Sequence, residues 1–486
     1  MLVRRRPAPS PPGTRDHLTG ATVGRYAIGS VGTAGFATLP GLVLVYYLTD
    51  TLGVAAAAAG AIVAVAKIWD VLIDPVIGTA SDRSLRRHGS RRPMMIVGAV
   101  ALPILFALTF AVPAALATPA AALWVAAAFL LTATAFSLFQ VPYIALPAEL
   151  TDRYDERTRL LTARVVVLTV GILAFGAGGP ALREIGGSDR VGYLVMAVVA
   201  GCVIGVSLLI ATRSAPRAAG PRGITVGAQP DADTDSTPLA AYRAAVTVLR
   251  RSRPLRLLVG AFLLQGLATG LMLADGQYIA TWILDDEGAV SVLFAALIAP
   301  ALVFAPVWGA VARRIGKESG FFIATVIFAV ATIGLCGLRW SPGWWVYPVI
   351  GIAGAAYAGM QSLPMAMIPD VISDDERRHG PGSAGIVGGV WTAGETTGMA
   401  LGAVVLTVFL TLGGYVSSEA DTDITQPAAA TTAMIVAFSI VPAALAAGSL
   451  VLIRRYPLRR SDIDSDQPRD SDQAGDGIGE GGPSAG

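Results

Sequence analysis

Charged residues are scarce in this sequence. They make up 14% of its 486 residues, and its mean hydropathy is +0.62. Soluble domains carry roughly a quarter of charged residues, so a chain this long and this poor in charge is not expected to fold in water. The formal net charge is only +2, which gives no electrostatic reason to expect a nucleic-acid partner. The composition instead predicts burial in lipid.

Cysteine and histidine are also few. The two cysteines, Cys202 and Cys336, lie in apolar runs without a partner at metal-binding spacing, and the chain has three histidines. A disulfide framework and a metal site are therefore not expected. The sequence has no nucleotide-binding loop or catalytic constellation, so we predict neither an enzyme nor a cofactor. Arg4, Arg5 and Arg6 precede a proline-rich polar stretch and not the apolar core of a secretory signal, so we expect the first apolar run to remain in the protein.

Long apolar runs are abundant. A helix needs about 20 apolar residues to cross a hydrocarbon layer of about 30 Å. Twelve runs reach this length, which predicts an all-α membrane protein with twelve transmembrane helices. They cover residues 24–49, 55–81, 93–116, 121–147, 162–182, 191–212, 255–283, 289–312, 319–338, 343–368, 384–413 and 430–453.

Lysine and arginine collect in alternate loops between these runs. Loops retained in the cytoplasm carry more of both residues, so the distribution predicts the orientation. The basic loops carry Arg83, Arg86, Arg87, Arg91, Arg92, Arg153, Arg157, Arg159, Arg313, Arg314, Lys317, Arg377 and Arg378. The opposite loops carry Arg183, Arg190, Arg339, Asp285, Asp286, Glu287, Glu419, Asp421 and Asp423. This pattern predicts a multi-pass protein of the cell membrane with both termini cytoplasmic.

A polar segment rich in Pro, Gly, Asp and Thr divides the runs into two sets of six. This division predicts two six-helix halves joined by a cytoplasmic linker, with a solvated tail after the last run. The predicted parts are a cytoplasmic tail at 1–23, the N-terminal half at 24–212, the linker at 213–254, the C-terminal half at 255–454 and a disordered cytoplasmic tail at 455–486.

A charged motif follows the second run of each half. Gly78, Asp82 and Arg83, with the arginines after them, resemble the G-x-x-x-D-R-x-G-R-R loop of the major facilitator superfamily, and Gly309 begins a degenerate second copy. We expect Gly78, Asp82 and Arg83 to form an inner gate whose contacts form and break as the halves rock. The alternative is a set of cytoplasmic arginines that only fixes the topology.

Ionisable residues inside the runs are candidate functional residues, because a charge at mid-bilayer costs about 2.5 to 3.5 kcal/mol. Lys67, Asp70 and Asp74 are spaced by three and four residues, which places them on one helical face. The two carboxylates offer oxygen ligands for Na⁺ or a shared site for H⁺, and Lys67 balances charge when the site is empty. Lys67 is also a candidate for solute binding. The alternative is an ion-paired face that only stabilises packing.

Further polar residues in the N-terminal half are candidates for the cation shell or for solute binding. Ser137 and Gln140 precede Pro142 in the fourth run, and they either complete such sites or hydrogen-bond to neighbouring helices. Arg164 offers a two-pronged donor to a solute or to an acid in the fourth run, or else extends to the headgroups at the inner boundary.

The C-terminal half holds Asp275 in one run and Glu395 with Thr396 in another. We predict that Glu395 takes part in proton or solute handling, and the alternative is a buried acid bonded to a neighbouring helix. Further candidates for a cavity lining are Tyr357, Gln361 and Trp391, for which plain packing is the alternative.

Several motifs together resemble the glycoside-pentoside-hexuronide:cation symporters, the melibiose permease group of the major facilitator superfamily. They include Lys67-Ile-Trp-Asp70-x-x-x-Asp74-Pro75, Tyr46-Tyr47-Leu-Thr49-Asp50, Val141-Pro142-Tyr143 and Pro369-Asp370. The similarity extends from the first run to the twelfth. It implies that Asp70 and Asp74 bind the coupling cation, together with a hydroxyl that falls at Ser137.

The resemblance is weaker for the solute site. Gln140 and Arg164 fall at positions that hold the sugar in this family, and Thr396 falls at the position of a family lysine. Ala34 and Gln140 stand where the family has sugar-binding acids. The resemblance therefore implies cation-coupled transport without implying a galactoside.

These observations predict a symporter in which cation binding strengthens solute binding, and the halves reorient only when both or neither are bound. The expected partners are a small solute, in particular a sugar or glycoside, a monovalent cation (Na⁺ or H⁺) and the bilayer, with the protein a monomer. The alternatives are a proton-driven exporter of drugs or metabolites that uses Glu395 and Asp275, a lysolipid symporter, and a membrane scaffold without transport.

Overall fold

Helices form nearly all of the regular structure in the described part of the chain. The computed structural model describes residues 18–151, 154–185, 189–215, 238–380, 384–419 and 424–458. Most of both predicted tails, linker residues 216–237, Arg153, Asp421 and Asp423 lie outside these ranges. The α-helices are α1 (Gly20–Tyr46), α2 (Ala56–His88), α3 (Arg92–Phe110), α4 (Thr118–Leu150), α5 (Tyr154–Glu184), α6 (Asp189–Thr212), α7 (Pro238–Arg251), α8 (Arg253–Trp282), α9 (Ala289–Ile315), α10 (Lys317–Gly334), α11 (Val346–His379), α12 (Ala384–Leu412), α13 (Ala428–Phe438) and α14 (Ile440–Arg454).

The predicted all-helical membrane fold is confirmed. Among the described residues, eleven segments are long and apolar enough to cross a membrane, and α13 and α14 together form one of them. The run expected at 343–368 is helical too, but glycine, proline, tyrosine and glutamine residues lower the hydropathy of α11, and it is not among the eleven. It packs along α9 and α10. The count of twelve transmembrane helices stays a prediction.

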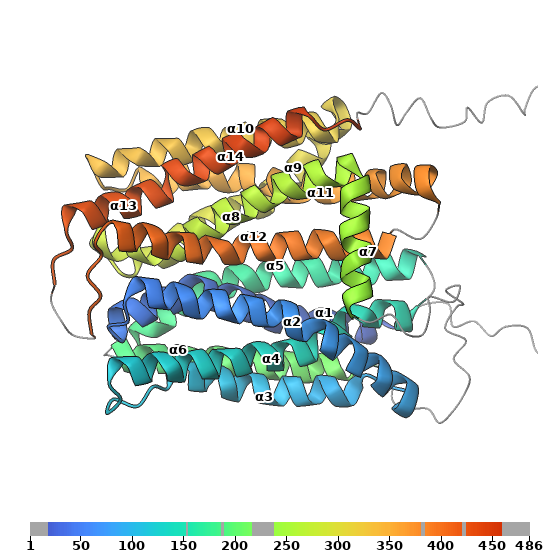
Figure 1. The fold of residues 1–486 in the computed structure, drawn as a ribbon, viewed down its shortest axis with the longest axis horizontal. Helices are drawn as coiled ribbons and strands as arrows, with labels where there is room; N and C mark the ends of the chain where they lie inside the picture. Colours follow the sequence, from blue (N-terminus) through green and yellow to red (C-terminus); the bar gives the residue numbers. More distant parts are fainter. Residues whose placement is uncertain are drawn as a thin grey trace, which may run out of the picture.

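The long helices form two packed groups (Figure 1). In the first, α1 packs against α5 and α6, and α3 packs against α4 and α6. In the second, α8 packs against α12 and α14, and α11 packs against α9 and α10. The groups meet where α2 contacts α12, α5 contacts α9 and α1 contacts α8. We call α1–α6 the first bundle and α8–α14 the second bundle.

The second apolar run continues as a helix beyond its predicted end. The apolar residues stop at 81, whereas α2 extends to His88. A helix that leaves the membrane no longer needs apolar side chains, so hydropathy marks the lipid boundary and not the helix end. α2 ends at Gly89, which has a φ of 66° that glycine adopts without strain. Asp82 and Arg83, predicted in a loop, therefore lie on the helix.

The predicted linker contains a helix that its overall composition does not suggest. α7 lies across the ends of the long helices in Figure 1 and packs against α8 and α12. Val248 is buried whereas Arg243 and Arg250 are exposed, so α7 is amphipathic. A helix of this kind is typical of a membrane surface.

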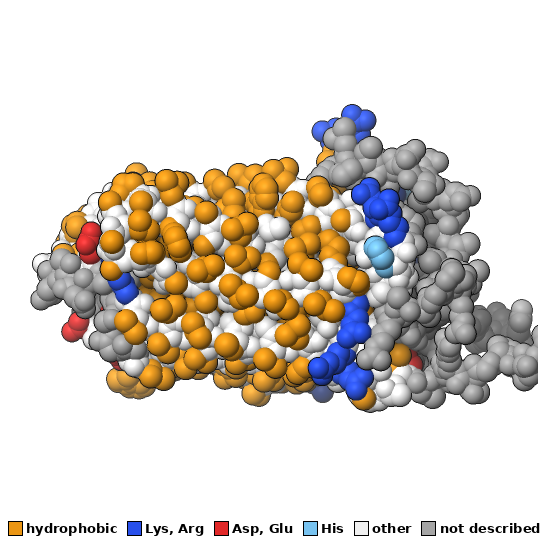
Figure 2. Space-filling view, turned by 90° about the horizontal axis from the view of Figure 1, so that it is seen from below, with side chains coloured by type: hydrophobic (Ala, Val, Ile, Leu, Met, Phe, Trp, Pro, Cys, Tyr) orange, Lys and Arg blue, Asp and Glu red, His pale blue; other side chains and the backbone are white. Residues whose placement is uncertain are grey.

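Charged side chains lie mainly at the two ends of the molecule, and its long side is apolar (Figure 2). Lysine and arginine gather at one end, which we call the basic end, and we call the opposite end the acidic end. Ion pairs stabilise the basic end within each bundle. Arg91 pairs with Asp82 and Glu149, and Lys317 pairs with Asp370 at 2.7 Å. These pairs link α3 to α2 and α4 in the first bundle and α10 to α11 in the second.

Polar contacts join the two bundles at the acidic end. The Thr49 and Tyr278 hydroxyls lie 2.7 Å apart, and the Tyr415 hydroxyl donates to the Asp50 carboxylate. Burial, together with the nearby Asp50 carboxylate, raises the pKa of Tyr415, so its hydroxyl remains a donor at neutral pH. Arg183 of α5 also forms a 2.6 Å ion pair with Glu287 of the α8–α9 loop. The bundles are therefore held together at this end.

α8 and α12 approach each other backbone to backbone. α8 has Gly266 and Gly270 four residues apart, and α12 has Gly398 and Gly402 at the same spacing. A Cβ atom at Gly270 would lie 2.1 Å from the Met399 carbonyl oxygen. Small residues four apart are typical of closely packed membrane helices. This contact fixes the register of α12 on α8.

We expect Gly270→Ala to destabilise the purified protein, because the added methyl group overlaps a backbone atom that moves only if α8 and α12 separate. Overpacking of this kind costs about 1–3 kcal/mol, which should lower the thermal unfolding midpoint by several degrees. Gly388→Ala in α12 is the matched control, since nothing lies within 4 Å of its Cβ position. Equal midpoints for the two variants would contradict the backbone contact.

We expect Tyr415→Phe to loosen the acidic end, because loss of a hydrogen bond to a carboxylate costs about 1.5–3 kcal/mol. The Ser418 amide, which donates to the Thr49 carbonyl at 3.0 Å, should then exchange its hydrogen faster, as measured by mass spectrometry. Tyr347→Phe is the control, because the Tyr347 hydroxyl makes no hydrogen bond with a described residue. Unchanged exchange in Tyr415→Phe would show that this bond does not keep the end closed.

Candidate functional site

The predicted cation-site residues lie together on α2 and α4. Asp70 and Asp74 are one turn apart on α2, and Lys67 Nζ lies 3.2 Å from Asp70 Oδ2. Asp74 interacts with the Ser137 hydroxyl of α4 and forms no ion pair within 4 Å with a described residue. Asp74 is exposed and Asp70 is partly exposed, so an ion can reach both. One lysine against two carboxylates leaves one negative charge for a monovalent cation.

The contact between α2 and α4 sets this geometry. Trp69 Nε1 donates a 2.9 Å hydrogen bond to Thr134 Oγ1, which fixes the rotation of α2 relative to α4. Ser137 lies one turn after Thr134 and is only 4% exposed. Its hydroxyl is therefore held beside Asp74 by a buried helix face, as a fixed ligand should be.

Gln140 and Arg164 make contacts within the first bundle. The Thr33 hydroxyl of α1 donates to Gln140 Oε1 at 2.9 Å, so the interhelical hydrogen bond considered for Gln140 is present. The Arg164 guanidinium lies 5.5 Å from the ring centroid of Tyr143, which stacks on Tyr26. Arg164 pairs with no acid among the described residues, and its Nε has no hydrogen-bond partner there. Its charge remains available to a solute.

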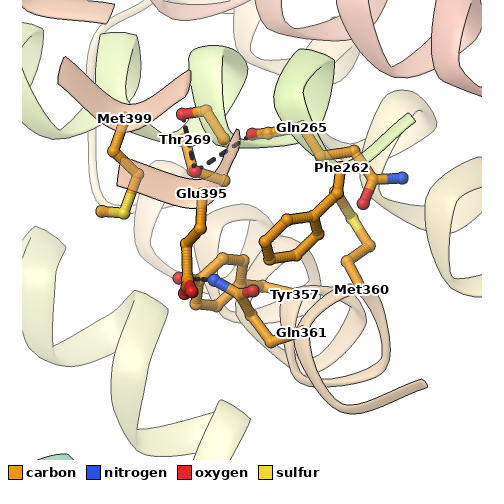
Figure 3. A pocket seen from close by; sticks show the side chains of 9 residues that line it. Phe262, Gln265, Thr269, Tyr357, Met360, Gln361, Glu395 and Met399 are labelled. Atoms are coloured by element: carbon orange, nitrogen blue, oxygen red, sulfur yellow. Dashed lines mark hydrogen bonds between the residues drawn. The ribbon is translucent and has the colours of Figure 1, made fainter. Parts of the chain in front are cut away.

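A small pocket in the second bundle brings together Glu395, Tyr357 and Gln361, all predicted from the sequence. Figure 3 shows the Glu395 side chain extending from α12 toward the Tyr357 hydroxyl and the Gln361 amide of α11. Gln361 Nε2 donates to the Tyr357 hydroxyl. The rest of the lining is mostly apolar and consists of Phe262, Gln265, Gly266, Thr269, Met360 and Met399.

The α8 side of this pocket was not predicted. Gln265 and Thr269 are polar residues one turn apart in a largely apolar run, and this spacing was the signal that the sequence offered. The Gln265 amide donates to Thr325 and Ser449 at 3.0 and 3.1 Å, which anchors it to α10 and α14. The Thr269 hydroxyl donates to the Gln265 carbonyl at 3.0 Å. Hydrogen bonds therefore hold both side chains in place on the α8 side of the pocket.

Two residues of α12 that were predicted as solute contacts do not line the pocket. Trp391 is 4% exposed and stacks on Phe262 with ring centroids 4.1 Å apart, so it supports the pocket wall from behind. Thr396 is exposed, and its hydroxyl donates to the Thr392 carbonyl at 3.0 Å. Asp275 also lies outside the pocket; it is fully buried in α8, and neither carboxylate oxygen has a hydrogen-bond partner in the described structure.

The predicted inner-gate residues lie at the basic end of α2. Asp82 is held by Arg91 at 2.6 Å, and Arg91 also pairs with Glu149, so Asp82 is linked to α3 and α4. Arg83 is exposed, and a Cβ atom at Gly78 would meet only Val141 of α4, at 3.8 Å. These contacts stay within the first bundle.

Comparison with known proteins connects this arrangement to a family. The sequence matches the family described as MFS/sugar transport protein over residues 25–460. The glucuronide carrier protein homolog of Escherichia coli (strain K12) is 25% identical, and the match covers 91% of this chain and 93% of that protein. The putative glycoside/cation symporter YagG of the same strain is 23% identical, with coverage of 87% and 88%.

A solved structure with the same fold is that of a D-xylose-proton symporter. It superposes with a TM-score of 0.64 at 11% identity and covers 90% of this chain and 96% of that chain. The family match confirms the resemblance drawn from the motifs around Asp70 and Asp74. The chain belongs to the MFS/sugar transport protein family, that of the glycoside-pentoside-hexuronide:cation symporters, and is a multi-pass protein of the cell membrane.

Proposed function

We propose that the protein is a symporter that couples uptake of a sugar or glycoside to a monovalent cation by alternating access. The observation that carries this proposal is the pair of carboxylates on α2, Asp70 and Asp74, with Ser137 facing the second of them. The names of the two relatives, a glucuronide carrier homolog and a putative glycoside/cation symporter, support the classes of solute and ion.

The cation binds at Asp74, with Ser137 and Asp70 completing its oxygen ligands. Lys67 already offsets the charge of Asp70 at 3.2 Å, so Asp74 has only a neutral hydroxyl beside it. An uncompensated charge in the membrane costs about 2.5 to 3.5 kcal/mol, and a bound cation removes most of that cost. Carboxylate and hydroxyl oxygens suit Na⁺, and a carboxylate also accepts H⁺.

The solute binds between the bundles, where polar side chains from both are available. The first bundle offers the unpaired guanidinium of Arg164 and the amide of Gln140. The second offers Glu395, Tyr357 and Gln361. A few fixed polar groups among aromatic and apolar side chains are typical of a small-molecule site.

The transport cycle opens and closes the two ends in turn. We place the basic end in the cytoplasm, because lysine and arginine gather at that end. In this proposal both termini are also cytoplasmic, and twelve spanning helices form two six-helix halves. The bonds of Asp50 with Tyr415 and of Arg183 with Glu287 then lie on the outer side, and they must break when a solute enters from outside. The protein works as a monomer, with Gly78, Asp82 and Arg83 at the inner gate.

We expect Asp74→Asn and Asp70→Asn each to reduce gradient-driven uptake of a radiolabelled β-glucuronide into proteoliposomes by about tenfold or more, that is, by at least ~1.4 kcal/mol. Asparagine keeps the size of the side chain and removes the charge that holds the ion. Asp285→Asn is the control, since Asp285 has a φ of 56° in a loop, a conformation that asparagine adopts readily. Undiminished uptake in both α2 variants, under Na⁺ and pH gradients, would refute the cation site.

We expect Ser137→Ala to weaken cation binding without abolishing it. One neutral ligand contributes about 0.5–1.5 kcal/mol, so the affinity should fall by about tenfold or less. The measurement is the Na⁺ or pH dependence of the thermal unfolding midpoint of the purified protein. A titration that matches the unmodified protein would remove this hydroxyl from the ligand shell.

A further inference from the structure

Glu395 is a carboxylate without a counter-charge. No described residue donates a hydrogen bond to it or forms an ion pair with it. It lies 11 residues after Ala384, the first residue of α12 at the basic end. This separation corresponds to about 16 Å of helix, well inside the membrane layer. An anion at that depth is costly unless a positive group binds beside it.

The second bundle has no positive charge to offer at this depth. Lysine and arginine are absent from residues 257–312, 318–338, 340–376 and 384–453. The basic residues of this half therefore lie only at the two ends of the helices. Arg256, the innermost of them on α8, donates to the Leu249 carbonyl and forms no ion pair with Glu395.

Two positive charges in the spans of the first bundle have acidic partners. Lys67 pairs with Asp70 at 3.2 Å, and Arg183 pairs with Glu287 at 2.6 Å. Arg164 lies over an aromatic ring of its own bundle, where its guanidinium interacts with the ring face. No charged side chain among the described residues therefore compensates Glu395, which leaves a proton or a positively charged ligand for this role.

The chemistry of the pocket favours an organic cation over Na⁺. Besides Glu395, its lining includes the rings of Phe262 and Tyr357 and the thioethers of Met360 and Met399. In Figure 3, Phe262 and Met399 lie on opposite sides of the Glu395 side chain. Aromatic faces attract ammonium groups, and thioether sulfur is soft and polarizable, whereas a hard cation needs several oxygen ligands.

The size of the pocket restricts the ligand further. It has room for about one water-sized group, so an ammonium substituent fits and a sugar ring does not. A sugar ring that carries the amine would remain outside this pocket. Stacking of Phe262 on Trp391 keeps the pocket wall from collapsing into this space.

We propose that this pocket receives the protonated amino group of an amino-sugar solute, and that amino sugars with a free amine are therefore among the substrates. The inference rests on the proposed transport function. Glu395 supplies the counter-charge, the rings of Phe262 and Tyr357 supply the aromatic faces, and the Tyr357 hydroxyl is oriented by its bond from Gln361. Acetylation of the amine removes the positive charge and with it the interaction.

The test compares D-glucosamine with N-acetyl-D-glucosamine and D-glucose on the purified full-length protein. We expect glucosamine to raise the thermal unfolding midpoint in a dose-dependent way, and the two neutral sugars at the same concentrations to leave it unchanged. Glu395→Gln should weaken glucosamine binding by tenfold or more, measured by calorimetric titration. Glu318→Gln is the matched control, because it removes the same charge from the same bundle at the start of α10, outside the pocket.

Glu395→Asp keeps the charge on a shorter side chain, so it should retain the preference for glucosamine over its acetylated form even if Glu395→Gln fails to fold. Equal binding of the three sugars by the unmodified protein, or undiminished glucosamine binding by Glu395→Gln, overturns the proposal. Cation binding is measured separately, as a change in the thermal unfolding midpoint with Na⁺ or pH. Asp74→Asn should remove this change. Glucosamine binding without any such shift would keep this inference and refute cation coupling.

Discussion

The cost of an uncompensated charge in a lipid environment governs where the ionisable groups of this protein lie. Most such groups are at the ends of the helices, and some of those inside the spans have partners, as Lys67 has Asp70 and Arg183 has Glu287. Asp74, Arg164, Asp275 and Glu395 also lie within the spans and form no ion pair with a described residue. The proposed site depends on Asp74, Arg164 and Glu395.

The two ends of the molecule are stabilised in different ways. At the basic end, the pairs of Arg91 with Glu149 and of Lys317 with Asp370 each stay within one bundle. At the acidic end, the bonds of Tyr415 with Asp50 and of Thr49 with Tyr278 cross from one bundle to the other. Ties within a bundle keep it rigid, and ties between bundles determine which end is closed. This division of roles is what a rocking motion requires.

The sequence predicted the parts of the site that depend on one helix alone. The placement of Lys67, Asp70 and Asp74 on one face follows from their spacing, because helical periodicity is local. Hydropathy located the spans, but it missed the end of α2 at His88 and the whole of α7, because helices outside lipid need no apolar run. The family resemblance drawn from the motifs was also correct.

The second-bundle pocket was harder to predict, because it depends on how three helices pack. Glu395, Tyr357 and Gln361 were recognised as polar residues in apolar runs, but nothing in their spacing shows that α11 and α12 bring them together. The roles of Phe262 as a wall and of Trp391 as its support depend on the contact between α8 and α12. That contact depends on glycines. Because glycine has no side chain, the pattern of polar and apolar residues does not reveal such a contact.

The glycine contact between α8 and α12 limits how the second bundle can deform. Where the two helices touch through their main chains, as at Gly270 and Gly402, no side chain lies between them that could change rotamer and absorb a sliding motion. α8 and α12 must therefore travel as one solid piece whenever the bundles tilt. The pocket between α8, α11 and α12 would then keep a constant distance between its α8 and α12 walls. A group bound there would move together with these two helices.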